Sequence, residues 1–181
     1  MLLVINGAPG IGKSTLARRY VDEVPLALLV EIDQIRMQLG GWVDREESRI
    51  VARGLAFELM RAHLRNDRDV VVAQFFGRPE FLAEMRDLAI THHTPLVEVC
   101  LTSGPEVLIE GFRARRIQYM ERGLDHPQSD LDETSLVGEL TRTNNQVVRD
   151  ASARGSVILP VNGDVEESLD CLRAAVGTVS E

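Results

Sequence analysis

The sequence predicts an α/β fold in which five parallel strands form one sheet that is covered by helices on both faces. Short apolar runs typical of buried strands alternate with longer helical segments along the whole chain. The pattern G-x-x-x-x-G-K-[ST] stands between the first apolar run and the first helix, where such a loop belongs in a parallel sheet. The 181 residues, 44% apolar and 27% charged, fit one globular domain with a sizeable core.

Each predicted strand is an apolar run bounded by residues that disfavour strands. Pro25 ends the first helix before the second run, and Asp33 follows that run directly. A turn of sequence Asn162-Gly163-Asp164 follows the last run. The predicted strands are residues 2–6, 26–32, 69–74, 95–101 and 156–161.

Caps and breakers place the helices. Asp33 is a good N-cap for a short helix over 33–39, which Gly40-Gly41 end. Pro79 suits the first turn of a later helix. The other predicted helices run from the glycine loop to about 23, over 45–65, over 79–90, from 103 past three arginines, over 132–151 and over 165–176. In the helix over 45–65 the expected apolar positions are Ile50, Leu55, Phe57, Leu59 and Met60.

One segment breaks the alternation of strands and helices. Residues 122–127, of sequence RGLDHP, are polar and rich in turn residues. They follow the helix that carries three arginines. We expect a small helical lid over about 113–130, within a single domain that spans 1–181.

The loop over residues 7–15 fits the binding of a phosphate group. It consists of Gly7, Ala8, Pro9, Gly10, Ile11, Gly12, Lys13, Ser14 and Thr15. Its glycines let backbone N–H groups face a phosphate, and the helix N-terminus adds about half a positive charge. Lys13, the only lysine in the chain, is expected to bridge the β- and γ-phosphates of ATP, and the Ser14 hydroxyl to ligate Mg²⁺. A glycine turn that binds nothing is the alternative, which pattern and context together disfavour.

Asp33 is the second candidate for chemistry. In an open α/β sheet, ligands gather beyond the carboxyl ends of the strands, and Asp33 directly follows one. A carboxylate beside the γ-phosphate can accept the proton of an attacking hydroxyl. The alternative is an N-cap, and the two roles are compatible. Arg36 lies one helical turn further along the same face, and Trp42 is a further candidate for an acceptor site.

Three features together resemble the small P-loop kinases: the loop, Asp33-Gln34-Ile35-Arg36 after the second strand, and an arginine-bearing helix after the fourth. That group includes chloramphenicol phosphotransferase, the zeta toxins and the kinase of polynucleotide 5′ ends. The resemblance spans nearly the whole chain, although only the loop is a highly specific motif. It implies a three-layer P-loop NTPase fold with strand order 2-3-1-4-5. It also implies that Asp33 is the general base and that Arg36 contacts the acceptor or the transferred phosphate.

The arginines of the lid helix fit this resemblance less closely. Such kinases usually carry two arginines about one turn apart on this helix, where they meet the triphosphate. Arg113, Arg115 and Arg116 are the candidates, and Gly111 stands at one expected arginine position. Arg113 and Arg116 share a helix face, so we expect Arg116 to act in catalysis and Arg113 to bind the nucleotide. A solvated basic helix face is the alternative.

The third strand departs from many P-loop enzymes, because no carboxylate ends it. Gln74 stands there and cannot replace the charge, which leaves Ser14 and phosphate oxygens as the main Mg²⁺ ligands and disfavours rapid ATP hydrolysis. Phe75 and Phe76 follow, and each either walls an acceptor pocket or plugs the core beneath the loop. By the same resemblance, Asn162-Gly163 stand where related kinases hold adenine against the backbone.

Composition restricts the partners. A net charge of −8 argues against a dedicated binder of long nucleic acids. No apolar run approaches the ~20 residues of a membrane-spanning helix, and a first strand next to Met1 leaves no room for a signal peptide. Cys100 and Cys171 lie in apolar periodic segments and are expected to be reduced core residues of a cytoplasmic protein.

These features predict an ATP-dependent phosphotransferase that acts on a hydroxyl of a small acceptor, such as an antibiotic, nucleoside or metabolite, with Mg²⁺. Lys13, Asp33, Arg36 and Arg116 are the expected catalytic residues. One alternative is a kinase of nucleotides or of polynucleotide 5′-hydroxyls. Another is a regulatory protein that binds ATP without transfer, which the missing third-strand acid favours slightly and Asp33 with Arg36 disfavours. The acceptor and the oligomeric state remain open.

Overall fold

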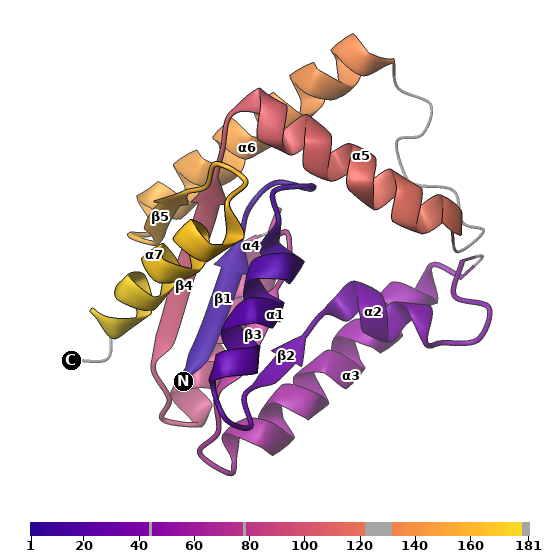
Figure 1. Cartoon of the computed structure of the whole chain (residues 1–181). Coiled ribbons are helices and arrows are strands. Elements are labelled where there is room, and N and C mark those ends of the chain that lie inside the picture. The colour runs from indigo at the N-terminus through magenta and orange to yellow at the C-terminus, as the bar shows by residue number, and fades with distance from the viewer. Residues whose placement is uncertain (44, 78, 122–131, 179–181) are drawn as a thin grey trace.

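Figure 1 shows the computed structural model of the chain, in which helices flank a five-stranded parallel sheet. The strand order is β2-β3-β1-β4-β5, which confirms the predicted order. The structure describes residues 1–43, 45–77, 79–121 and 132–178. The strands are β1 (Leu2–Asn6), β2 (Leu28–Val30), β3 (Val70–Ala73), β4 (Leu96–Thr102) and β5 (Val157–Pro160).

The helices occupy the predicted places, with ends that differ by a few residues. They are α1 (Lys13–Glu23), α2 (Ile32–Met37), α3 (Glu47–Leu64), α4 (Pro79–Thr91), α5 (Pro105–Glu121), α6 (Glu133–Ala153) and α7 (Val165–Gly177). Residues 113–121 of the predicted lid therefore form the end of α5. The rest of the lid as far as 130, including His126, lies outside the described residues.

Two local predictions about the second strand are wrong. The strand is shorter than 26–32, because Leu26 adopts a positive φ of 62° and Ile32 already begins α2. Asp33 is not the N-cap of that helix. The cap residue is Glu31, whose side chain makes no capping bond, and Asp33 lies in the first helical turn. A carboxylate in the first turn still benefits from the helix dipole.

The two faces of the sheet bury different strand residues. Leu3 and Ile5 of β1 belong to a core shared with α1, α5 and α7. Leu2 and Val4 point the other way and pack with α3 and α4. On that side of the sheet, α6 covers β4 and β5 around the buried Cys100. Alternation of side chains along a strand buried on both faces accounts for this division.

The buried face of α3 differs from the prediction. Phe57 and Met60 are buried as expected, but Ile50 is 75% exposed, and Leu55 and Leu59 are about half exposed. Two alanines, Ala52 and Ala56, lie on the buried face instead, together with Leu64. Small residues at the contact let a helix lie close to its neighbours, so the largest apolar side chains do not mark the buried face.

The two cysteines have different surroundings, so the prediction that both are core residues is wrong for one. Cys100 is buried, and burial raises the pKa of its thiol to about 11. Cys171 is exposed on α7. Within the described ranges, no helix is long and apolar enough to span a membrane.

Candidate active site

The site lies at the carboxyl ends of β1, β2 and β3, where open parallel sheets bind their ligands. Figure 1 shows α5 crossing above these strand ends, from the end of β4 toward α2. Two cavities meet at the glycine loop beneath α5. Gly10, Gly12, Thr15 and Gly111 line both of them.

Hydrogen bonds fix the loop to its surroundings. The Asn6 side chain, fully buried, accepts hydrogen bonds from the backbone N–H of Gly7 at 2.8 Å and of Phe76 at 3.0 Å. It thereby ties the loop to the segment that follows β3. The Lys13 Nζ donates to the carbonyl oxygens of Gly7 and Ala8 at 3.0 and 2.8 Å.

The backbone of α5 touches the loop directly. A Cβ atom built on Gly111 would lie 1.8 Å from the carbonyl oxygen of Gly10. Gly10 has a φ of +83°, and a Cβ there would lie 2.8 Å from backbone atoms of Leu108 and Phe112. No side chain fits between the two segments, which explains why glycine stands where the kinase resemblance leads one to expect arginine.

The first cavity has a volume of about 360 Å³ and combines the loop with three other elements. Its polar lining includes Lys13, Ser14, Glu31, Asp33, Gln34, Gln74, Arg115, Gln118 and Tyr119. The pKa of Lys13 is lowered to about 7, chiefly by burial and to a smaller extent by the nearby positive charge of Arg115. An anion bound at the loop would supply the counter-charge that Lys13 lacks.

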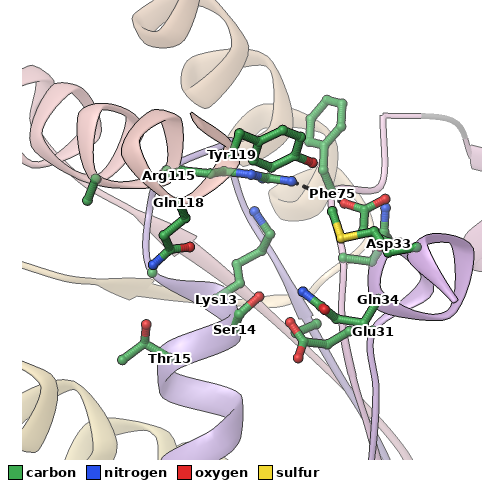
Figure 2. A pocket seen from close by; sticks show the side chains of 17 residues that line it. Lys13, Ser14, Thr15, Glu31, Asp33, Gln34, Phe75, Arg115, Gln118 and Tyr119 are labelled. Carbon is green, nitrogen blue, oxygen red and sulfur yellow. Dashed lines mark hydrogen bonds and ion pairs between the residues drawn. The ribbon is translucent and has the colours of Figure 1, made fainter. Parts of the chain in front are cut away.

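Asp33 and Arg115 face one another inside this cavity. The Arg115 Nη2 lies 3.1 Å from the Asp33 Oδ2 and joins α5 to α2 across the strand ends. Figure 2 shows this pair above Lys13, with Tyr119 beside the guanidinium. The guanidinium carbon of Arg115 lies 5.8 Å from the centre of the Tyr119 ring. The pair places a proton acceptor and a cation together near the phosphate loop.

The other predicted arginines do not line either cavity. Arg36 Nε donates to the Ser48 hydroxyl at 2.7 Å, and its guanidinium lies 4.9 Å from the centre of the Trp42 ring. Trp42 is likewise absent from the cavity linings. Arg113 and Arg116 are exposed on α5. The structure thus brings Arg115 to Asp33 and leaves the other three arginines outside.

Helical spacing from Gly111 identifies the inward face of α5. Gly111, Ala114, Arg115, Gln118 and Tyr119 all line the first cavity. They follow the i, i+3, i+4 spacing of one helix face. Because Gly111 touches the loop, the residue four positions later, Arg115, is the inward arginine, rather than the predicted pair of Arg113 and Arg116.

Sequence reasoning also missed Glu31. This carboxylate lines the first cavity, and its side chain is only 17% exposed. Its nearest cation is Arg18, whose Nη2 is 4.0 Å away, and no hydrogen bond reaches the carboxylate from any described residue. Arg18 lies one turn beyond Ser14 on α1, so Glu31 faces the same side of α1 as Ser14. Its position two residues before Asp33, at a strand end, was the available signal.

The two phenylalanines after β3 have different positions. Phe75 is 38% exposed and lines the first cavity. Phe76 is buried and stacks on Phe81, with ring centres 5.0 Å apart. One aromatic therefore walls the cavity and the other fills the core. Gln74 also lines the first cavity, at the strand end where many P-loop enzymes carry an acid.

The second cavity, of about 260 Å³, lies on the other side of the loop. Apolar residues from several elements line it, namely Ile11, Leu16, Leu101, Val107, Val161 and Val165. Gly163 lines it as well, whereas Asn162 does not. The Asn162 side chain instead donates to Glu167 Oε2 at 2.8 Å.

Comparisons with known proteins agree with this geometry. The family model AAA_33, described as an AAA domain, matches residues 2–155. A gluconokinase from Sinorhizobium meliloti 1021 has a similar structure (TM-score 0.58, 19% identity), over 98% of this chain and 93% of that one. The Deinococcus radiodurans tunicamycin resistance protein is also similar (TM-score 0.65, 12% identity), over 97% of this chain and 95% of that one. No curated protein matches the sequence.

Proposed function

The chain belongs to the AAA_33 family of AAA domains, and on that premise we propose that it is a kinase that transfers the γ-phosphate of ATP to a hydroxyl of a small acceptor. One observation carries the proposal. Asp33 and Arg115 meet at 3.1 Å in a cavity that Lys13 and Ser14 of the phosphate loop also line. A protein that only binds nucleotide has no need of a carboxylate at this place.

The two cavities suit the two parts of ATP. The loop amides and Lys13 would hold the β- and γ-phosphates at the first cavity. The apolar second cavity, with Gly163 at its edge, would receive the base. Gly10 and Gly12, which line both cavities, would lie along the phosphate chain. The volume of this cavity, about 260 Å³, is suited to one nucleoside.

The residues present fit Mg²⁺ held mainly by the nucleotide. The Ser14 side chain lines the first cavity, and Glu31 lies on the same side of α1. In the part of the chain that the structure describes, no group of three or more His, Cys, Asp or Glu forms a metal site by itself. Ser14 would ligate the ion and Glu31 would hold one of its waters, while the ion neutralises phosphate charge.

Asp33 and Arg115 would then divide the work of transfer. Asp33 accepts the proton of the acceptor hydroxyl while the hydroxyl oxygen forms the new bond to the γ-phosphorus. The bond from that phosphorus to the bridging oxygen of ADP breaks, and the charge leaves with ADP. Arg115 stabilises charge on the transferring group, after exchanging Asp33 for phosphate as its partner. The position of α5 over the cavity would help to exclude water and limit ATP hydrolysis.

A regulatory protein that binds ATP without transfer is the second candidate. The observation that favours it is the end of β3, where Ala73 and Gln74 stand in place of an acid. A transfer assay with γ-labelled ATP across a library of hydroxylated acceptors separates the two functions, with Lys13→Ala as the blank. A kinase labels at least one class of acceptor above the blank. ATP binding without any labelled product would favour the regulatory protein.

A further inference from the structure

The part of the first cavity beyond Lys13 is formed by side chains from three elements. We name this set the acceptor wall. It consists of Asp33, Gln34 and Met37 from α2, Gln74 and Phe75 after β3, and Gln118 and Tyr119 from α5. The cavity volume of about 360 Å³ must hold the γ-phosphate as well as the acceptor, so the acceptor is a small molecule.

The charge of the cavity opposes an anionic acceptor. Among the described residues that line it, the cations are Lys13 and Arg115. Lys13 lies on the loop that holds the donor, and Arg115 is already paired with Asp33. Arg36, the expected acceptor arginine, contacts Ser48 and Trp42 instead. A phosphate or carboxylate on the acceptor would therefore compete with the triphosphate for both cations, and would lie near two carboxylates.

The polar groups of the acceptor wall match hydroxyls. Gln34, Gln74 and Gln118 each offer an amide that both donates and accepts hydrogen bonds. A hydroxyl also donates and accepts, so three amides can hold several hydroxyls of one molecule. A carboxylate or phosphate offers only acceptors and would leave the amide oxygens without partners.

An apolar surface completes the wall. Phe75 is 38% exposed although it lines a cavity, and Met37 and Tyr119 line the same space. In Figure 2, Phe75 and Tyr119 lie on one side of the cavity, while Gln34 and Glu31 lie on the other. A ring compound that carries hydroxyls on its edge and C–H groups on its face satisfies both sides.

We propose, on the basis of the kinase function above, that the acceptor is an uncharged polyhydroxylated ring compound without phosphate or carboxylate groups. Free sugars and nucleosides share this chemistry. The prediction distinguishes them from their phosphorylated or oxidised counterparts, which carry the same hydroxyls together with an anion.

Matched pairs of acceptors test this proposal. Each pair compares a neutral compound with its anionic counterpart: glucose with gluconate, glucose with glucose 6-phosphate, and a nucleoside with its 5′-monophosphate. Affinity is measured by calorimetric titration into the protein saturated with ADP and Mg²⁺, and kcat/KM with γ-labelled ATP. The neutral member of at least one pair is expected to bind and react at least about tenfold better, roughly the effect of one uncompensated charge. The pair that responds separates a sugar from a nucleoside.

Binding is measured apart from turnover, so the proposal and the kinase function fail separately. Preferred binding of a neutral member without any labelled product supports the acceptor class and contradicts the kinase function. Equal affinity within every pair, no binding of any member, or tighter binding of the anionic members overturns the acceptor class.

A charge-adding variant sharpens the test. Gln34→Arg places a cation in the acceptor wall and is expected to narrow the preference for the neutral member about tenfold. Gln38→Arg is the matched control, because Gln38 lies one turn further along, is exposed and does not line the cavity. A preference that changes equally in both variants would contradict recognition by the acceptor wall.

Discussion

The two ends of the first cavity are built in different ways. The donor end is one continuous loop, whose backbone N–H groups and single lysine are proposed to hold the phosphates. The acceptor end gathers side chains from α2, the end of β3 and α5, which are far apart along the chain. A loop of this kind tolerates little sequence variation, because its backbone conformation itself forms the binding site. Side chains on three elements can be exchanged one at a time, so the same fold can serve many acceptors.

Arg115 stands where the two ends meet, and its loss is expected to have the largest effect among the following predictions. Arg115→Gln removes both the partner of Asp33 and the cation for the transferring phosphate, and should lower kcat about 10²–10³-fold. Arg116→Gln, one residue further and exposed, should change kcat much less. Steady-state kinetics of the two variants show whether Arg115 or Arg116 is the catalytic arginine. A larger loss in Arg116→Gln would return the catalytic role to the residue first predicted from the sequence.

Gly111 tests whether the contact between α5 and the loop matters to the donor end. Gly111→Ala places a Cβ against the Gly10 carbonyl and should lower the free energy of unfolding by about 1–3 kcal/mol, because backbone must move. ATP affinity should fall as well. Gly138→Ala on α6 is the matched control, since a Cβ there meets nothing within 4 Å. It should be neutral or stabilising by about 0.5–1 kcal/mol in chemical denaturation.

Phe75 tests the acceptor end alone. Phe75→Ala should raise the KM for the acceptor about tenfold and leave the KM for ATP unchanged, because Phe75 lines the first cavity and not the second. Gly77→Ala should give a smaller change in the same direction, since a Cβ there would lie 2.7 Å from the Phe75 ring and would displace it. An equal rise of both KM values would mean that the segment after β3 supports the loop rather than the acceptor.

The smallest expected effect is the dependence of the donor end on pH. The pKa of Lys13 is lowered to about 7 in the free protein, chiefly by burial, and bound phosphate should raise it again. The free protein therefore holds fewer protons than the complex above pH 7, so ATP binding at pH 8 should take up as much as about one proton. Calorimetry in two buffers of different ionisation enthalpy measures this uptake. Uptake should disappear at pH 6, where Lys13 is protonated in both states.

The same shift acts on stability. The unfolded chain holds the Lys13 proton up to a higher pH than the folded chain does. The burial of Lys13 therefore lowers the free energy of unfolding most below pH 7. This destabilisation declines as the pH rises toward 10.5, the ordinary pKa of lysine. Bound nucleotide should remove the destabilisation at neutral pH.

The contrast between the two ends also explains what could be predicted from the sequence. The strands, the glycine loop and the position of Asp33 after β2 follow from apolar periodicity and one specific motif. The strand order was implied by the resemblance to the small P-loop kinases. The inward face of α5 could not be predicted in this way. Three arginines lie within four positions, and only the contact of Gly111 with the loop shows that Arg115 is the one that faces inward. Arg36 was placed by helical phase and by the resemblance to the small P-loop kinases, and neither shows that Ser48 and Trp42 lie within its reach.

Residues of the acceptor wall were the hardest to predict, for a similar physical reason. Glutamine carries no local signal, and Gln74 stands out in the sequence only by its place at the end of the third strand. Phe75 and Phe76 are adjacent and alike in sequence, yet successive side chains point in opposite directions, so one enters the cavity and the other the core. Such distinctions depend on tertiary contacts rather than on pattern.

Asp33→Asn tests the central claim most directly, because it keeps the shape of the side chain and removes its ability to accept a proton. Transfer to the best acceptor should fall about 10²–10⁴-fold, while the affinity for ATP is retained, since Asn no longer holds Arg115 away from the phosphate. Asp22→Asn, an exposed acid on α1 that lines neither cavity, should behave as the unmodified protein. Loss of ATP binding, or transfer at the original rate, would contradict the assignment of Asp33 as the general base.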